Sequence, residues 1–305
     1  MNRSFLVFRY DDYGKSTWTA TSKQLDYAVL ETFRSRAIPL VVAAIPEPLN
    51  EQPDSINLLD RYVSSGLVEV VLHGWDHKPS QVLLANSGIK GELPGLPYEE
   101  QLKRLLQGKR LLESWLNQSV TTLAPPWNRY DTTTLRACET AGIQAVTADV
   151  HGPSLYDTPV LLLPSTTSLS GLVKVIDRWE QDPRPNRLAV VCFHSYDFKE
   201  DGGNQAGLSL QQLDAVLKRV SASPGIAVVD CRTATQQLGN KLSLARLTAC
   251  QNVYNLASEI WSSRVRSSFV RRIPFFYADL DSTGYETEQF YRMLARKWRL
   301  LRYLP

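Results

Sequence analysis

Hydrophobic and polar positions follow two different periods along the chain, and these separate candidate strands from candidate helices. Residues 5–10, 38–45 and 188–193 are nearly continuous apolar runs, as expected of strands buried on both faces of a parallel sheet. Residues 98–116 instead repeat apolar side chains every three or four positions, which is typical of an amphipathic helix. The two patterns alternate from about residue 5 to residue 238. They therefore predict an α/β fold of parallel strands joined by helices.

The number of candidate strands distinguishes a closed barrel from an open doubly wound sheet. Seven or eight candidates favour a (β/α) barrel. Residues 79–97 are rich in Pro and Gly and show no period, which predicts a long loop that covers or forms a binding site. The remaining predicted strands span 67–72, 120–124, 143–148, 160–163 and 226–229. The remaining predicted helices span 22–37, 56–65, 132–141, 168–180 and 209–221.

The last 67 residues break this alternation and differ in charge. Residues 239–305 contain 11 Lys and Arg against 5 Asp and Glu, whereas residues 1–238 contain 23 against 26. We therefore predict two parts, a barrel over 1–238 and a basic helical C-terminal extension over 239–305. A basic amphipathic helix can lie on an anionic membrane surface or contact a protein, but packing on the barrel with solvated charges is the favoured interpretation. The acidic body and the absence of a recognition motif argue against nucleic-acid binding.

Cysteine usage and the start of the chain bear on its compartment. The four cysteines are scattered and form no CxxC pair, so neither a disulfide framework nor a sulfur-ligated zinc site is indicated. The sequence enters its first strand almost at once and contains no apolar run long enough to span a bilayer. These features predict a cytoplasmic protein.

Polar residues gather where the predicted strands end. The ends of parallel strands meet at one rim of the barrel, which is where such folds bind ligands and carry catalysis. Three of the four histidines of the chain are in this set. The fourth, His151, also lies near the rim and is interpreted as a loop residue. The strand-end residues are Asp11, Asp12, His73, His77, Trp127, Asn128, Asp149 and His194.

His73 and His77 are four residues apart, so both imidazoles would face one way if the segment turned helically. Alone, this pair is interpreted equally well as loop histidines bonded to the backbone. With Asp11 and Asp12 at another strand end, a metal site is favoured, because two adjacent carboxylates need compensating positive charge. Two His and one carboxylate leave room for water on a divalent ion, with zinc expected.

Four segments together resemble a known family. They are Asp11-Asp12, the His-x-x-x-His of His73-Gly74-Trp75-Asp76-His77, the stretch Ala124-Pro125-Pro126-Trp127-Asn128, and the strand Val190-Val191-Cys192-Phe193-His194. In this order they resemble the polysaccharide deacetylase family, also called the NodB-homology or carbohydrate esterase 4 family. The resemblance covers roughly residues 5–238 and implies a distorted (β/α) barrel and one divalent metal ion. The segment 124–128 matches only in part, since the family has an Arg where this chain has Ala124.

The resemblance also assigns roles. It implies that Asp12, His73 and His77 hold the metal, that Asp11 is the general base, and that His194 is the general acid. The family Arg steadies the base, and Arg9 or Arg129 is expected to replace it. A further departure is Tyr13, which stands where the family usually has Gly.

The remaining strand-end residues are assigned from their side chains. We expect Trp75, Trp127 and Tyr13 to stack on a sugar ring, although packing is the alternative interpretation. Asn128 is expected to contact the substrate. Asp149 is expected either to orient His194 or to cap a loop.

These roles predict a metal-dependent hydrolase that removes an N-acyl group, N-acetyl above all, from a saccharide or a saccharide-containing precursor. The lost Arg at position 124 keeps open a related amidohydrolase or deformylase that acts on a different C–N bond. A non-catalytic member that binds carbohydrate or serves as a membrane-associated scaffold is the third possibility.

Overall fold

The computed structural model describes residues 4–15, 20–87, 90–148, 158–181, 187–202 and 207–238. Its strands are β1 (Ser4–Tyr13), β2 (Leu40–Ala44), β3 (Val68–Leu72), β4 (Thr122–Leu123), β5 (Ala145–Ala148), β6 (Leu161–Thr167), β7 (Leu188–Phe193) and β8 (Ile226–Val228). Its α-helices are α1 (Ala20–Ser35), α2 (Pro46–Leu49), α3 (Pro53–Val63), α4 (Gln81–Ser87), α5 (Tyr98–Leu116), α6 (Thr132–Thr140), α7 (Leu169–Gln181), α8 (Leu210–Ala222) and α9 (Cys231–Leu238). Three 3₁₀ turns complete it, η1 (Pro126–Asn128), η2 (Ser195–Asp197) and η3 (Lys199–Asp201).

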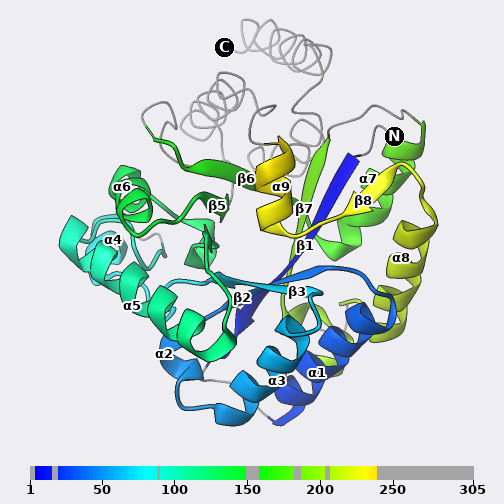
Figure 1. Cartoon of the computed structure of the whole chain (residues 1–305), viewed down its shortest axis with the longest axis horizontal. Coiled ribbons are helices and arrows are strands. Elements are labelled where there is room, and N and C mark those ends of the chain that lie inside the picture. The colour runs from blue at the N-terminus through cyan, green and yellow to red at the C-terminus, as the bar shows by residue number, and fades with distance from the viewer. Residues whose placement is uncertain are drawn as a thin grey trace, which may run out of the picture.

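Seven parallel strands close into a barrel with the helices outside (Figure 1). Strands β2 to β7 follow one another in order, and β1 closes the ring by pairing with both β7 and β2. Strand β8 is an eighth, outlying strand that pairs only with residues 4–6 at the start of β1. This arrangement confirms the predicted α/β fold and identifies the barrel as a distorted one of seven strands.

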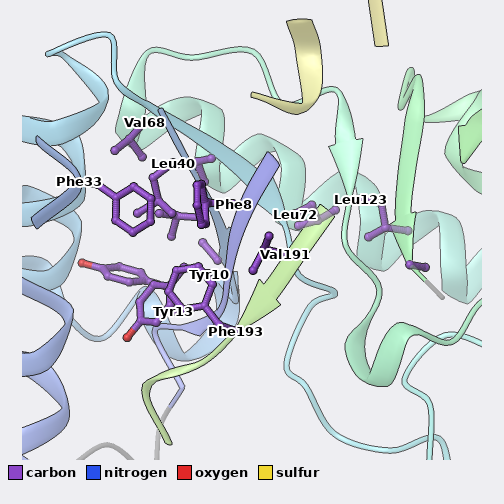
Figure 2. Packing of buried hydrophobic residues seen from close by; sticks show 14 of the residues in the cluster. Phe8, Tyr10, Tyr13, Phe33, Leu40, Val68, Leu72, Leu123, Val191 and Phe193 are labelled. Carbon is purple, nitrogen blue, oxygen red and sulfur yellow. The ribbon is translucent and has the colours of Figure 1, made fainter. Parts of the chain in front are cut away.

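Alternate residues of β1 face opposite sides of the barrel wall, as strand geometry requires. Leu6, Phe8 and Tyr10 belong to the large core between wall and helices, where Phe8 packs edge-on against Phe33 at 5.1 Å between ring centroids (Figure 2). Val7 belongs to a second, smaller core within the barrel. The same alternation sends the polar Arg9 and Asp11 toward the barrel interior.

The end of the barrel opposite the strand C-termini is filled by α9. Cys231 and Ala234 of this helix are fully buried in the interior core, next to side chains from the strands. Glu69 of β3 is also buried there, and its Oε2 accepts hydrogen bonds from the amides of Cys231 (2.6 Å) and Arg232 (3.2 Å). A carboxylate at the start of a helix satisfies amides that lack an intrahelical partner.

Most predicted elements lie within a few residues of the observed ones, and the differences among the described residues are helices α2, α4 and α9. The segment 79–97 was expected to be a loop without structure, which is wrong, because it contains α4. Helix α9 was not predicted at all. The helical extension over 239–305 lies outside the described residues. Within the described residues, no helix has the length and hydropathy needed to cross a membrane.

Candidate active site and metal site

The two carboxylates that end β1 both reach the mouth of the barrel because the strand is irregular there. The pairing of β1 with β2 shifts register between Tyr10 and Tyr13, and Asp12 has a left-handed backbone with φ of 66°. In a regular strand, neighbouring side chains would point to opposite faces. The bulge therefore allows Asp11 and Asp12 to serve one site.

Asp12, His73 and His77 form a compact set of candidate metal ligands. Their ligand atoms lie within 4.8 Å of one another, and Asp12 Oδ1 is 3.1 Å from Nε2 of both histidines. The Nδ1–H of His73 donates to the Ala124 carbonyl oxygen at 2.7 Å, which leaves Nε2 free to act as a ligand. Metal-binding histidines characteristically use their second nitrogen in this way. One carboxylate and two imidazoles, oriented like this, fit a divalent metal ion.

The two histidines converge through an irregular turn and not through the helical turn that was considered from their spacing. Gly74 (φ 69°) and His77 (φ 54°) both have left-handed backbones, and no helix is present at residues 73–77. His73 directly follows β3, while the turn brings His77 back beside it, with ring centroids 5.1 Å apart.

Arg9 forms a buried two-point ion pair with Asp11. Its Nε and Nη2 donate to Asp11 Oδ1 and Oδ2, each at 2.8 Å. The guanidinium is fully buried, and it also donates to the Thr147 carbonyl oxygen at 2.6 Å and to Asn128 Oδ1 at 2.8 Å. Burial of Asp11 favours its neutral form, but Arg9 and the nearby His73 and His194 outweigh this and hold the pKa of Asp11 below its ordinary value. Arg9 thus occupies the place expected for a partner that keeps Asp11 ionised.

His194 faces Asp11 from the end of β7. Its Nε2 is 4.0 Å from Asp11 Oδ2, while its Nδ1–H donates to Asp197 Oδ2 at 3.2 Å. Asp197 therefore fixes the orientation of the imidazole. Sequence reasoning missed Asp197, although its position three residues after His194 was a usable signal.

The thiol of Cys192 is a second contact of Asp11 that sequence reasoning missed. Cys192 lies in β7, two residues before His194. Its Sγ donates to Asp11 Oδ2 at 3.2 Å and accepts from Arg9 Nη2 at 3.1 Å. Burial and the charge of Asp11 raise the pKa of this thiol well above its ordinary value, so it acts here as a neutral hydrogen-bonding group.

Aromatic side chains line the mouth, with one correction to the predicted set. Trp127 lies against the His77 ring at 4.3 Å between centroids, and Trp75 is partly exposed. Tyr13 cannot stack on a ligand, because it is 1% exposed and its hydroxyl donates to the Ser55 carbonyl oxygen (Figure 2). Tyr196 was not predicted, yet it is 46% exposed and stacks on His194 at 4.4 Å with an interplanar angle of 15°.

Asn128 reaches the site, where its Oδ1 accepts from Arg9. Ala124, at the position of the family Arg, is fully buried and contributes its carbonyl oxygen to His73. Asp149 and His151 lie outside the described residues.

Comparison with known proteins agrees with this fold. Residues 4–146 match the family model described as polysaccharide deacetylase. The matched residues include Asp11, Asp12, His73 and His77, so this part of the chain is similar to the polysaccharide deacetylase family. Comparison with curated proteins gave no match.

Two solved structures with TM-scores above 0.5 support the fold. A putative polysaccharide deacetylase from Mycobacterium smegmatis is similar with a TM-score of 0.58 at 12% identity, covering 79% of this chain and 91% of that one. A 4-alpha-glucanotransferase from Thermococcus litoralis has a TM-score of 0.54 at 14% identity, over 77% of this chain and 40% of that one. A family 4 acetyl xylan esterase from Clostridium thermocellum, in complex with a cobalt ion, has a TM-score of 0.49 at 11% identity, over 77% and 92%.

Proposed function

We propose that this protein is a metal-dependent hydrolase that removes an N-acyl group, above all N-acetyl, from a saccharide or a saccharide-containing precursor. The observation that carries the proposal is the juxtaposition of two sets of side chains at one barrel mouth. Asp12, His73 and His77 form the metal-type donor set, and Asp11, buried and paired with Arg9, lies beside it. Similarity to the family supplies the reaction class.

The residues divide the chemistry of amide hydrolysis between them. A divalent ion held by Asp12, His73 and His77 would polarise the substrate carbonyl and lower the pKa of water. Asp11, kept ionised by Arg9, accepts a proton from the water that adds to the carbonyl carbon. The resulting tetrahedral adduct breaks its C–N bond, and His194 Nε2 donates a proton to the departing nitrogen. The acyl group leaves as a carboxylic acid, and the sugar keeps a free amine.

The geometry of His194 suits this role. Its Nδ1–H is engaged by Asp197, so Nε2 is the nitrogen that faces Asp11 and the site. His194 Nε2 and Asp11 Oδ2 are 4.0 Å apart, so the proposed acid and base face the same part of the site. The aromatic rings of Trp127 and Tyr196, each against a site histidine, offer apolar faces to a sugar ring.

Two alternatives come from different classes. A deformylase or related amidohydrolase was favoured by the missing Arg at position 124. The contacts of Arg9 weaken that motive, because Asp11 has an arginine partner here after all. A non-catalytic carbohydrate-binding or scaffold protein would not require the buried Arg9–Asp11 pair next to candidate metal ligands. The cytoplasmic location stays a prediction.

The test is release of acetate from N-acetylated saccharides. The full chain, freed of metal and then loaded separately with Zn²⁺ and Co²⁺, is assayed on N-acetylglucosamine oligomers and on a nucleotide-linked N-acetyl sugar. N-formyl analogues of the same sugars are run in parallel, so that formate release identifies the deformylase alternative. We expect acetate release that depends on the metal.

Asp11→Asn is the matched control, because it removes the base and leaves the three ligand residues in place. It should retain metal and lose at least about 100-fold in rate, as expected when a general base is removed. Equal rates in Asp11→Asn and the unaltered chain would refute the assigned base. Metal binding without any acyl release from the panel would favour the non-catalytic alternative.

A further inference from the structure

The turn that carries His77 is held from outside by one carboxylate. Glu92, in the segment between α4 and α5, accepts the Trp75 amide on Oε1 at 2.7 Å and the His77 amide on Oε2 at 2.9 Å. Each carboxylate oxygen thus receives one N–H from the same turn. The bonds span 15 and 17 residues of sequence, so they do not belong to a local turn motif.

Glu92 is fully buried, and burying a carboxylate is costly unless its oxygens are well bonded. The nearest described cation is Arg104 of α5, whose Nη1 is 3.7 Å from Glu92 Oε1, too far for a hydrogen bond. The two amides are therefore the principal partners of the carboxylate. Glu92 takes no part in the hydrolysis proposed above.

Glu92 also explains why residue 74 must be glycine. Gly74 has φ of 69°, and a Cβ there would lie 2.2 Å from Glu92 Oε2 and 2.8 Å from Pro126 Cγ. The carboxylate consequently packs directly on the backbone of the turn. His77 itself has a left-handed backbone, which is unfavourable for residues other than glycine. Such a conformation persists only when the surrounding structure imposes it.

We propose that Glu92 is a positioning residue for the metal site, which holds the turn so that His77 Nε2 meets the ligand atoms of Asp12 and His73. The inference rests on the metal site of the proposed function, but not on its reaction. Loss of a partner that orients a metal ligand typically weakens metal binding by about 10- to 100-fold.

Glu92→Gln tests this with the least change in shape. An amide keeps only one acceptor oxygen and must direct its NH₂ toward one of the two backbone N–H groups. We expect Co²⁺ affinity of the metal-free full chain to fall about 10- to 100-fold, measured by visible absorbance and by competition with a chromogenic chelator. His77→Ala gives the reference for complete loss of that ligand.

Glu113→Gln is the matched control. Glu113 is also a carboxylate that accepts a backbone amide, that of Val120 at 2.9 Å, but it lies on α5 away from the ligands. It should bind Co²⁺ as the unaltered chain does. Unchanged affinity in Glu92→Gln, or an equal loss in both variants, would overturn the positioning role.

A second measurement avoids the risk that Glu92→Gln does not fold. In the unaltered metal-free chain, the Trp75 and His77 amides should exchange with solvent deuterium slowly, near the rate of global unfolding. Rapid exchange of both amides would overturn the proposal, since it would mean that Glu92 does not hold the turn. Because neither readout is acyl release, the positioning role and the deacetylase proposal can fail separately.

Discussion

Arg9 and Asp11 lie two residues apart on β1, and this spacing places both side chains on the interior face of the barrel. A buried carboxylate beside two further acidic or metal-binding groups needs a fixed positive charge to stay ionised. The family solves this with an Arg after another strand, whereas here Arg9 supplies it from the strand of the base itself. Ala124 can then be small, because the guanidinium reaches Asp11 from β1.

Removing the Arg9 guanidinium should mainly change the pKa of Asp11. In Arg9→Met, burial raises the pKa of Asp11 against only the weaker opposition of His73 and His194, so the acid limb of the rate profile should move to higher pH. We expect the acyl-release rate at neutral pH to fall about 100-fold or more. Arg9→Lys keeps a charge and should move the limb less. The measurement is the pH dependence of kcat/KM.

A surface pair serves as the control for this prediction. Arg36 makes the same two-point contact with Asp214, at 2.7 and 2.6 Å, but far from the barrel mouth. Arg36→Met should leave the pH profile unchanged. If Arg9→Met gave the profile of the unaltered chain, Arg9 would not be the partner that ionises Asp11.

Glu69 gives a prediction for stability that is independent of catalysis. Burial, and then the charge of Asp230, raise the pKa of Glu69 to about 7 from an ordinary value of about 4.5. Between these values the folded state binds more protons than the unfolded state, so stability falls as pH rises from about 4.5 to about 7 and is level above. The shift corresponds to about 3 kcal/mol.

Glu69→Gln should therefore reduce this decline. Its amide oxygen can still accept from the Cys231 and Arg232 amides, which both bond to Oε2 alone. We expect the variant to gain stability over the unaltered chain at pH 8 and to gain least at pH 4.5. Urea unfolding of metal-free protein across that range measures it, and an unchanged slope would contradict the raised pKa.

At the scale of single elements, the site depends on places where regular structure ends. Asp12, His77, Trp127 and Asn128 all have left-handed backbones, and all lie at the barrel mouth. Non-glycine residues seldom adopt this conformation, and they cluster where a fold imposes it for function. The bulge in β1 and the turn after β3 thus place the ligands, while the strands only deliver them to the rim.

Gly14 should be indispensable to the end of β1. Its φ is 91°, and a Cβ there would lie 2.9 Å from Leu49 Cβ and 3.3 Å from the Ile45 carbonyl oxygen. Gly66 is a matched glycine, with φ of 76° and open space around its missing Cβ. Gly66→Ala should cost about 1–2 kcal/mol for its left-handed backbone alone.

Gly14→Ala should cost about 1–3 kcal/mol more than Gly66→Ala, because it adds a clash to the backbone term. It should also weaken Co²⁺ binding, since Asp12 lies two residues away, while Gly66→Ala should not. Denaturant unfolding and the Co²⁺ titration measure the two effects. Equal stability losses would show that α2 yields to the added methyl group.

At the scale of the molecule, one strand holds the barrel together. β1 pairs along successive parts of its length with β8, β7 and β2, so it both closes the ring and carries the proposed base and a candidate metal ligand. The opposite end of the interior is filled by α9, whose Ala234 is fully buried. The candidate site and helix α9 lie at opposite ends of the barrel. We therefore expect that a substitution in α9 can lower stability without changing metal affinity.

Ala234→Leu tests that separation. Adding three carbon atoms to a filled interior should cost about 1–3 kcal/mol of stability. Gln237→Leu, at an exposed position of the same helix, controls for the change in helix composition. We expect a lower thermal midpoint in the first variant only, with Co²⁺ affinity unchanged in both. A loss of Co²⁺ affinity in Ala234→Leu would mean that the packing of α9 affects the candidate metal ligands.

Local pattern alone determined the fold class and the list of rim residues. Buried strands and amphipathic helices have hydrophobic periods of a few residues. The order of the elements and the residues at the strand ends, including His73 and His194, could therefore be predicted. The resemblance added roles for Asp11, Asp12 and the histidines. These predictions needed no contact between distant parts of the chain.

Tertiary structure decided how those residues are held. The convergence of His77 with His73 comes from an irregular turn bonded to Glu92, and not from the helical spacing that the sequence suggested. The choice of Arg9 as the partner of Asp11, and the burial of Tyr13, depend on which strands and helices pack side by side. These features depend on contacts between residues far apart in the chain, and such contacts cannot be predicted from the periodicity of the sequence.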